Sequence, residues 1–290
     1  MRIYKDGKIP DVIRIEQDMA GPRVVMFAGV HGDEVSGVHA LEKLFFDLFA
    51  GSRTLRGGSL TLVRANARAL AAERRYVRHN LNRLFRDEYR PDIDRSAYEL
   101  CRAQELKTVL RSCDYFLDLH SAPTAQEPFL VAEATMVPFF SKLGIPRIMT
   151  GWSKFASGPI GGDAENYGNA HGAKSATLES GSHFDKRSND VAYRTVINLL
   201  SVLGMLDAEA PPAQPLQIAE VYAVVTKDCD DFRYAQEVEN FQLIKKGETF
   251  AIQDGRPLTV TEDSYLLIPM KPESTKIREE VCYLGRQIAA

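Results

Sequence analysis

The sequence predicts an α/β protein: a mixed, largely parallel sheet with helices on both faces, followed by a small β-rich C-terminal domain. Two observations support this prediction. Short apolar runs alternate with helix-length amphipathic segments as far as Leu206. After prolines at positions 211, 212 and 215, the chain continues as short apolar runs separated by turn residues, a pattern typical of β-structure.

The apolar runs before the prolines are short and bounded by turn residues, as buried strands are. The first is Val24 to Val30, and Ser59 to Arg64 follows a Gly57-Gly58 turn. Between them, Glu34 to Leu48 carries apolar residues at helical spacing. The same criteria predict further strands at 115–120 and 173–178, and helices at 96–111 and 192–206.

The prolines predict a stiff linker, because helices usually end before a proline and Pro-rich segments are extended. We therefore expect a larger domain over residues 1–210 and a β-rich domain over residues 211–290. In the second domain we expect turns at 246–248 and 254–257, and strands at 220–225, 242–244, 249–252 and 264–270.

Composition excludes several classes of function. The 290 residues are 44% hydrophobic and 26% charged, with a formal net charge of -3, so no basic balance points to nucleic acid. No apolar stretch approaches the roughly 18 residues that span a membrane, and the N-terminus lacks the apolar core of a signal peptide. The four cysteines form no C-x-x-C pair. We expect a cytoplasmic protein with reduced thiols and no membrane or nucleic-acid partner.

Residues suited to metal binding and proton transfer follow three of the predicted strands. His31 and Glu34 come after the first run, His120 ends the run 115–120, and Glu179 closes the run 173–178. In an open α/β sheet, ligands bind beyond the carboxyl ends of the strands. Two histidines and one glutamate can supply the three protein ligands of a catalytic zinc ion. Glu179 would then be a separate carboxylate that moves protons.

A single H-x-x-E motif is weak support for a metal site, and the chain contains it twice. His39 and Glu42 form the second copy inside the predicted helix 34–48, and we interpret that copy as part of a solvated face. Asp118 points to the same side of its strand as His120. We expect Asp118 to accept the ring N–H of a metal-bound histidine; the alternative is a partly buried Asp paired with a nearby Arg.

Two further segments are candidates for the site. An arginine-rich stretch covers 74–86, in which we interpret Arg74, Arg78 and Arg86 as solvated. An Asn-Arg pair near a metal could hold a substrate carboxylate, and one further Arg could face an oxyanion. The glycine-rich segment 151–172 is expected to be an irregular active-site loop, or otherwise a surface connection.

Taken together, these motifs resemble the succinylglutamate desuccinylase/aspartoacylase family, a branch of the zinc carboxypeptidase superfamily. The resemblance covers roughly residues 20 to 205, and the β-rich tail fits the family's C-terminal domain more loosely. It rests on the ordered set His31-x-x-Glu34, Asn66-x-Arg68-Ala69, Leu81-Asn82-Arg83-Leu84-Phe85, Asp118-Leu119-His120-Ser121 and Leu178-Glu179.

The resemblance implies a zinc-carboxypeptidase-like fold and a zinc-dependent catalytic domain over residues 1–210. It implies that His31, Glu34 and His120 bind one zinc ion, although the same donor types suit other divalent ions. It also implies that Arg68 polarises the scissile carbonyl, and that Glu179 acts first as general base and then as general acid.

For the substrate, the resemblance implies that Asn82 and Arg83 bind the carboxylate of the amino-acid half, and that Tyr283 is contributed by the tail. The sequence departs from the family at two places. Asn80 stands where relatives often have Asp, and the segment 151–172 lacks the arginine with which aspartoacylases bind an acidic side chain.

The sequence therefore predicts a zinc-dependent hydrolase that cleaves the amide bond of an N-acyl amino acid or a similar small amide. A zinc carboxypeptidase acting on short or unusual peptides is the alternative, and a non-catalytic binding protein with the same fold is a weaker one. A serine-hydrolase interpretation of Ser180-Gly181-Ser182-His183 lacks the G-x-S-x-G turn. We expect His171 and His183 to be loop or surface histidines rather than ligands.

Overall fold

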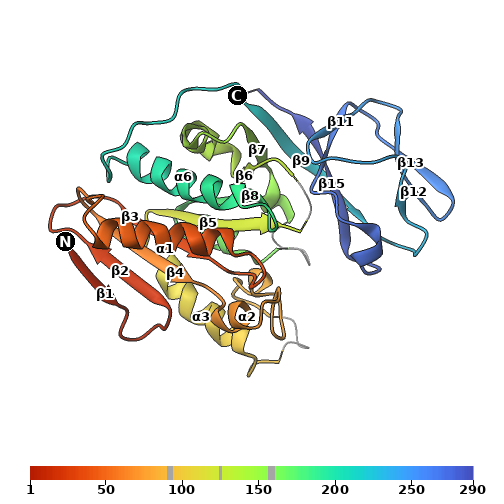
Figure 1. Ribbon diagram of the computed structural model, residues 1–290. Helices are drawn as coiled ribbons and strands as arrows, with labels where there is room; N and C mark the ends of the chain where they lie inside the picture. Colours follow the sequence, from red (N-terminus) through yellow and green to blue (C-terminus); the bar gives the residue numbers. More distant parts are fainter. Residues whose placement is uncertain (90–93, 124–125, 156–160, 290) are drawn as a thin grey trace. The chain divides into compact units, whose positions relative to one another are not determined.

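A computed structural model describes residues 1–89, 94–123, 126–155 and 161–289 (Figure 1). The chain divides into two compact units. The first comprises Met1–Pro146 and Trp152–Pro215, and the second comprises Arg147–Gly151 and Leu216–Ala290. The main division thus lies close to the proline-rich segment, and one short internal segment joins the second unit. The assignment of catalysis to residues 1–210 stays a prediction.

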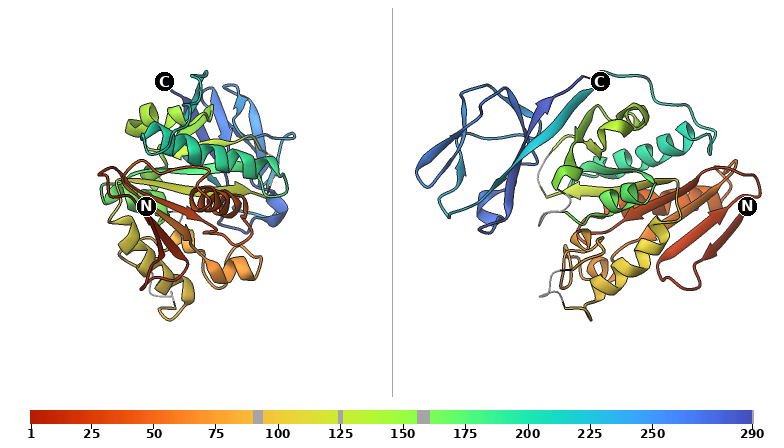
Figure 2. Two further views of the ribbon diagram at one scale, coloured as in Figure 1. Left: turned by 60° about the vertical axis from the view of Figure 1, so that its left-hand side comes forward. Right: turned by 180° about the vertical axis from the view of Figure 1, so that it is seen from behind.

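The first unit is built on a mixed sheet in the order β1-β2-β4-β3-β5-β8-β6. The four central strands β4, β3, β5 and β8 are parallel, while β1, β2 and β6 run antiparallel to their neighbours. β1 and β2 lie at one edge, beside the N-terminus (Figures 1 and 2). The predicted mixed, largely parallel sheet is confirmed. The strands are β1 (Arg2–Lys5), β2 (Val12–Glu16), β3 (Arg23–Ala28), β4 (Ser59–Arg64), β5 (Tyr115–Ala122), β6 (Phe129–Ala132) and β8 (Lys174–Ser182).

Helices cover both faces of this sheet, as predicted. α1 (Ser36–Phe49) and α6 (Arg187–Val202) pack against each other and against one face, and α3 (Tyr98–Leu110) and α5 (Ala164–Ala170) cover the other. The α1 packing is close: a Cβ added to Gly37 would lie 2.5 Å from the Cβ of Leu119. Shorter helices are α2 (Ala67–Ala71), α4 (Val137–Phe140), η1 (Leu81–Arg83), η2 (Ala134–Met136), η3 (Ser141–Leu143) and η4 (Trp152–Phe155).

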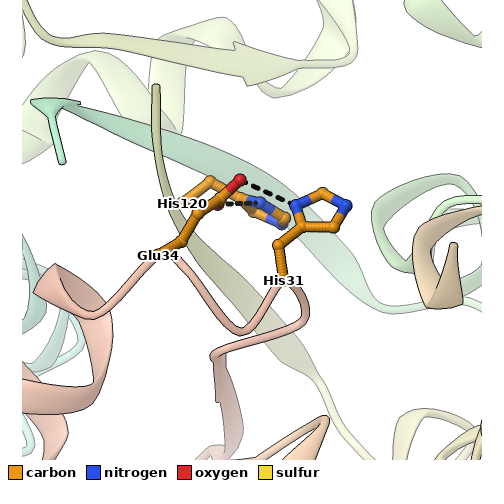
Figure 3. A group of neighbouring side chains, drawn as sticks. All are labelled: His31, Glu34 and His120. Carbon is orange, nitrogen blue, oxygen red and sulfur yellow. Dashed lines mark hydrogen bonds and ion pairs between the residues drawn. The ribbon is translucent and has the colours of Figure 1, made fainter. Parts of the chain in front are cut away.

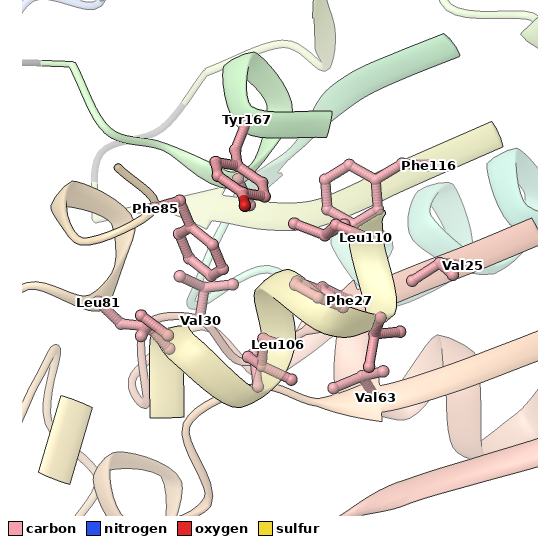
Figure 4. Close-up of a cluster of buried hydrophobic side chains, with 14 of the residues drawn as sticks. Val25, Phe27, Val30, Val63, Leu81, Phe85, Leu106, Leu110, Phe116 and Tyr167 are labelled. Carbon is pink, nitrogen blue, oxygen red and sulfur yellow. The ribbon is translucent and has the colours of Figure 1, made fainter. Parts of the chain in front are cut away.

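The core beneath α3 supports the strands that carry the candidate site (Figure 4). Phe27 of β3 and Phe116 of β5 are fully buried, and their rings meet edge to face with centroids 4.8 Å apart. Leu106 and Leu110 of α3 pack in the same cluster. Strand side chains alternate between faces, so Asp118 and His120 lie on the same face of the sheet as Phe116.

The second unit is β-rich. One group of strands has the order β7-β9-β15-β14-β11, and a three-stranded sheet has the order β10-β12-β13. Its own core includes Phe232, Phe250 and Val281. The elements are β7 (Arg147–Thr150), β9 (Gln217–Thr226), β10 (Arg233–Tyr234), β11 (Gln242–Ile244), β12 (Thr249–Gln253), β13 (Arg256–Thr259), β14 (Ser264–Leu267), η5 (Pro272–Ser274) and β15 (Glu280–Gln287).

Several expected boundaries were wrong for local reasons. The segment 151–172 is not wholly irregular, because Asp163 caps α5 by accepting the backbone N–H of Asn166 at 2.8 Å; residues 156–160 lie outside the described part. The expected turn 254–257 is confined to Asp254 and Gly255, both with positive φ, after which β13 begins. None of the helices in the described residues is both long and apolar enough to cross a membrane.

Candidate active site

The three predicted metal ligands lie together at the end of the parallel strands. His31 and Glu34 stand in the connection from β3 to α1, and His120 stands in β5. Glu34 lies between the rings: its Oε1 is 2.8 Å from Nδ1 of His31, and its Oε2 is 2.8 Å from Nδ1 of His120 (Figure 3). Each of the three residues is only 3% exposed. One ligand atom from each residue lies within 4.8 Å of the other two.

Two glycines shape the loop that carries His31 and Glu34. Gly29 ends β3 with φ +65°, a conformation that other residues rarely adopt. Gly32 lies against α2, where an added Cβ would be 2.0 Å from the carbonyl carbon of Ala69. The N–H of Gly32 also donates to the carbonyl oxygens of Arg74 and Arg75, at 3.1 and 3.3 Å. These contacts bring the arginine-rich stretch to the metal-ligand cluster.

The outer nitrogen of each ring faces an oxygen. Nε2 of His120 forms an ion pair with Oδ2 of Asp118 at 3.0 Å, although the angle is not that of a well-aligned hydrogen bond. Nε2 of His31 lies 3.0 Å from Oδ1 of Asn80. An oxygen at Nε2 favours the tautomer that carries its proton there, which leaves Nδ1 free as a ligand. Asp118 therefore lies next to the ring nitrogen that it was expected to bond, while its role as the acceptor of that N–H stays a prediction. Asn80 lies at the same distance from Nε2 of the other ring.

The charges in the cluster stabilise each other. Burial alone would raise the pKa of Glu34, but the charges of His31 and His120 hold it well below its usual range. Burial would lower the pKa of His120, yet Asp118 and Glu34 raise it well above the ordinary value. Burial lowers the pKa of His31. The buried Glu34 carboxylate therefore stays ionised because positive charge on His120 and Arg75 lies against it, and a bound metal cation would provide the same kind of environment.

Arg75, and not Arg68, contacts the cluster. The guanidinium of Arg75 donates to Oε1 of Glu34 at 3.1 Å. Arg68 lies on α2 with an exposed side chain, and its guanidinium stacks over the ring of Tyr98 at 4.4 Å from the centroid. The sequence offered many arginines in this region. The contacts of Gly32 bring the backbone of both Arg74 and Arg75 close, and the hydrogen bond to Glu34 identifies Arg75 as the one whose side chain reaches the site.

Glu179 lies beside His120. The two residues are partners in the parallel register of β5 and β8, so β8 continues through Glu179 instead of ending before it. Burial, and next the charge of Glu34, raise the pKa of Glu179 to about 7. Its Oε2 is buried and has no hydrogen-bond partner within the described residues. A carboxyl group with this pKa can accept and return a proton near neutral pH.

Asn82 and Arg83 form the short helix η1 next to the cluster. Oδ1 of Asn80 accepts the N–H of Asn82 at 3.0 Å, so one oxygen contacts both this turn and His31. Oδ1 of Asn82 accepts the N–H of Ala164 at 3.2 Å, and the guanidinium of Arg83 donates to the Asn82 carbonyl at 2.8 Å. The turn is therefore tied both to the metal-ligand cluster and to the start of α5.

Other expected positions have different outcomes. Tyr283 belongs to the second unit, where it lies in β15 opposite Val224 and Leu267, so its role in the site stays a prediction. His39 is exposed on α1 and faces Glu42 at 4.0 Å, as a solvated pair.

Two expectations about solvated or loop residues were incomplete. His183 lies in the loop just after β8, as expected, but it is half-buried and its Nδ1 lies 2.8 Å from Oγ of Ser121. Arg86 is partly buried and donates to the carbonyl of Gly161. No motif in the sequence distinguishes these two residues, because their partners are distant along the chain.

Comparisons with known proteins place the chain in a family. The model of the succinylglutamate desuccinylase/aspartoacylase catalytic domain matches residues 20–203. A succinylglutamate desuccinylase from Serratia proteamaculans (strain 568) is 28% identical over 272 residues, which cover 85% of this chain and 79% of the relative.

Solved structures show the same fold. A succinylglutamate desuccinylase from Vibrio cholerae superposes with a TM-score of 0.78 at 21% identity, covering 99% of this chain and 90% of that one. A product-bound ectoine utilization protein, EutE (DoeB), from Ruegeria pomeroyi gives 0.70 at 22% identity, covering 94% and 88%. The family match spans more than half of the sequence, and the matched range contains the positions of His31, Glu34, His120 and Glu179. The chain therefore belongs to the succinylglutamate desuccinylase/aspartoacylase family.

Proposed function

We propose that this protein is a zinc-dependent hydrolase that cleaves the amide bond of an N-acyl amino acid or a similar small amide. The observation that carries the proposal is the buried group of His31, Glu34 and His120 with Glu179 beside it. Relatives named succinylglutamate desuccinylase support the choice of an N-acyl amino acid as the substrate class.

The donor set fits zinc. Two imidazole nitrogens and a carboxylate are ligands that zinc uses in catalytic sites, where a fourth position stays open. Both Nδ1 atoms face Glu34, and both Nε2 atoms face an oxygen of Asp118 or Asn80. His31, Glu34 and His120 would hold the ion, and oxygens at Nε2 are the partners that metal-bound histidines use.

Glu179 performs the proton transfers in this proposal. When bound, zinc supplies a positive charge that makes a nearby water more acidic and polarises a carbonyl group. Glu179 takes the proton of the attacking water, and later gives it to the departing amine nitrogen as the C–N bond breaks. Its raised pKa suits both steps, because a group with a pKa near the working pH is effective as base and as acid.

Arginines provide the remaining positive charge. We assign to Arg75 the role that the sequence suggested for Arg68, because Arg75 contacts Glu34. Its other N–H groups are then available to a developing oxyanion. Arg83 offers a planar donor pair for the substrate carboxylate, and the Asn82 carbonyl fixes the orientation of that side chain.

Amine release from a panel of amides tests the proposal. N-acetyl and N-succinyl derivatives of acidic and neutral amino acids are incubated with zinc-loaded protein, with and without a chelator, beside short peptides. We expect chelator-sensitive turnover of at least one N-acyl amino acid and its loss in Glu179→Gln. Turnover of peptides alone would instead favour the carboxypeptidase alternative, and full activity of Glu179→Gln would refute the assignment of the base.

A further inference from the structure

A second group of metal-ligating side chains lies beside the first. One ligand atom each from Asp33, Glu34 and His183 lies within 4.8 Å of the other two. Two donors of one zinc ion stand at most about 4.2 Å apart, twice a bond length of about 2.1 Å. A small movement of these side chains would therefore bring all three into contact with one cation.

His183 is oriented for this role by its surroundings. Its backbone N–H donates to the carbonyl of Ala122 at 2.8 Å, which fixes the chain just after β8. Its Nδ1 is 2.8 Å from Oγ of Ser121, so Nε2 is the nitrogen left to bind a ligand. Burial lowers the pKa of His183, which favours the neutral ring that a metal requires.

Two buried atoms of this group stand out among the described residues. Nε2 of His183 and Oδ1 of Asp33 are buried, and neither has a hydrogen-bond partner within the part of the chain that the structure describes. Buried polar atoms without a partner are rare and call for an explanation such as a bound ion or water. A cation accounts for both atoms at once, because each of them can offer a lone pair.

We propose that Asp33, Glu34 and His183 form a second site for a divalent transition-metal ion, which shares Glu34 with the site of His31 and His120. The inference rests on the proposed function only through this shared carboxylate. One nitrogen and two carboxylate donors suit zinc, cobalt or manganese.

The second site is weaker than the first on electrostatic grounds. Once the first dication is bound, it and the guanidinium of Arg75 place three positive charges beside the Glu34 carboxylate. A second dication at the same carboxylate is repelled by these charges, so it binds only when the free metal concentration is higher. We therefore expect stepwise binding, with one tight equivalent followed by a weaker one.

Metal counting tests this inference on the full chain. Metal-stripped protein is equilibrated with buffers of stepped free Zn²⁺, and bound zinc is measured by mass spectrometry. We expect wild type to take up two equivalents in two steps, and His183→Gln and Asp33→Asn to keep the first and lose the second. His39→Gln is the matched control: His39 is an exposed histidine that faces Glu42 at 4.0 Å, so its loss leaves both steps unchanged.

Cobalt provides an independent readout. Two Co²⁺ ions bridged by the Glu34 carboxylate couple magnetically, so the paramagnetic resonance signal per cobalt falls when the second ion binds. Ser121→Ala removes only the hydroxyl that orients His183. It should weaken the second step and leave the first, even if His183→Gln disturbs both.

The outcomes separate this inference from the proposed function. A wild type that takes up one equivalent and hydrolyses amides overturns the second site alone, as does a second equivalent that survives His183→Gln and Asp33→Asn. A wild type without any tight equivalent overturns the proposed zinc hydrolase itself.

Discussion

Replacing Arg75 by leucine separates the two arginines that compete for the oxyanion role. Arg75 donates to Oε1 of Glu34 at 3.1 Å, and 44% of its side chain is exposed. The substitution removes the N–H donors that we assign to the developing oxyanion, and because the side chain is partly exposed we expect the fold to be retained. Arg68→Leu is the matched control, because it removes the same side chain from the position that stacks on Tyr98.

The expected magnitudes differ strongly between the two variants. Loss of one oxyanion donor typically lowers kcat by about 10²- to 10³-fold, equivalent to roughly 2.7–4 kcal/mol of barrier. We expect a loss of this size for Arg75→Leu. An exposed cation–π contact contributes about 0.5–1 kcal/mol, so Arg68→Leu should lose a little stability and keep its kcat.

Steady-state kinetics on the best amide substrate, with zinc content measured on the same samples, provides the assay. Zinc is kept saturating so that a weakened metal site does not imitate a lost donor. Equal kcat losses in the two variants, or a larger loss in Arg68→Leu, would refute the assignment of Arg75.

Three further predictions concern Glu179, Asn80 and Glu165, all in the first unit. Glu179 must be ionised to accept a proton, so kcat/KM should fall as the pH drops through the pKa of this carboxyl group. We expect that pKa at or below about 7, because burial raises it and a bound dication lowers it. A pH–rate profile without an acidic limb would contradict this role. Asn80→Ala removes the acceptor for Nε2 of His31 and should weaken zinc binding by about 10- to 100-fold, measured by chelator competition. Asn80→Asp keeps an acceptor at this position and should keep the zinc affinity near that of wild type. Unchanged zinc affinity in Asn80→Ala would show that the contact has no effect. Burial, and next the charge of Asp163, raise the pKa of Glu165 well above its usual value, so the folded state retains a proton that the unfolded chain releases above about pH 4.5. Stability is therefore lost as the pH rises from about 4.5 towards the pKa of Glu165 in the folded state. Glu165→Gln removes this loss, so its gain in melting temperature should be larger at about pH 8 than at about pH 5. Equal gains at the two pH values would refute this linkage.

The parts of the fold that depend on local pattern could be predicted. The strand 59–64 is observed with the expected bounds, because an apolar run after a Gly-Gly turn has few alternatives. The strands β1 and β2 were missed, since β1 is Arg-Ile-Tyr-Lys and lies largely exposed at the sheet edge. Pairing with β2 stabilises β1. The sequence of a short, mostly polar segment does not predict which strand it pairs with.

The site, like the fold, contains some residues that local sequence pattern identifies and others that only tertiary contacts identify. His31, Glu34 and His120 could be found because each follows or ends an apolar run, and strand ends converge in a parallel sheet. Arg75, Asn80 and His183 depend on contacts between segments that are far apart along the chain. Only the folded backbone decides which arginine, amide or imidazole completes such a contact, so the residue types alone could not identify them.

Reconstitution with zinc tests the central claim most directly. Metal-stripped protein is titrated with Zn²⁺, and bound zinc and amine release are measured at each step. We predict that activity rises in proportion to bound zinc up to one equivalent, that His120→Gln abolishes both zinc binding and activity, and that His39→Gln changes neither. Amide hydrolysis by the metal-free chain, or an unchanged first equivalent in His120→Gln, would contradict it.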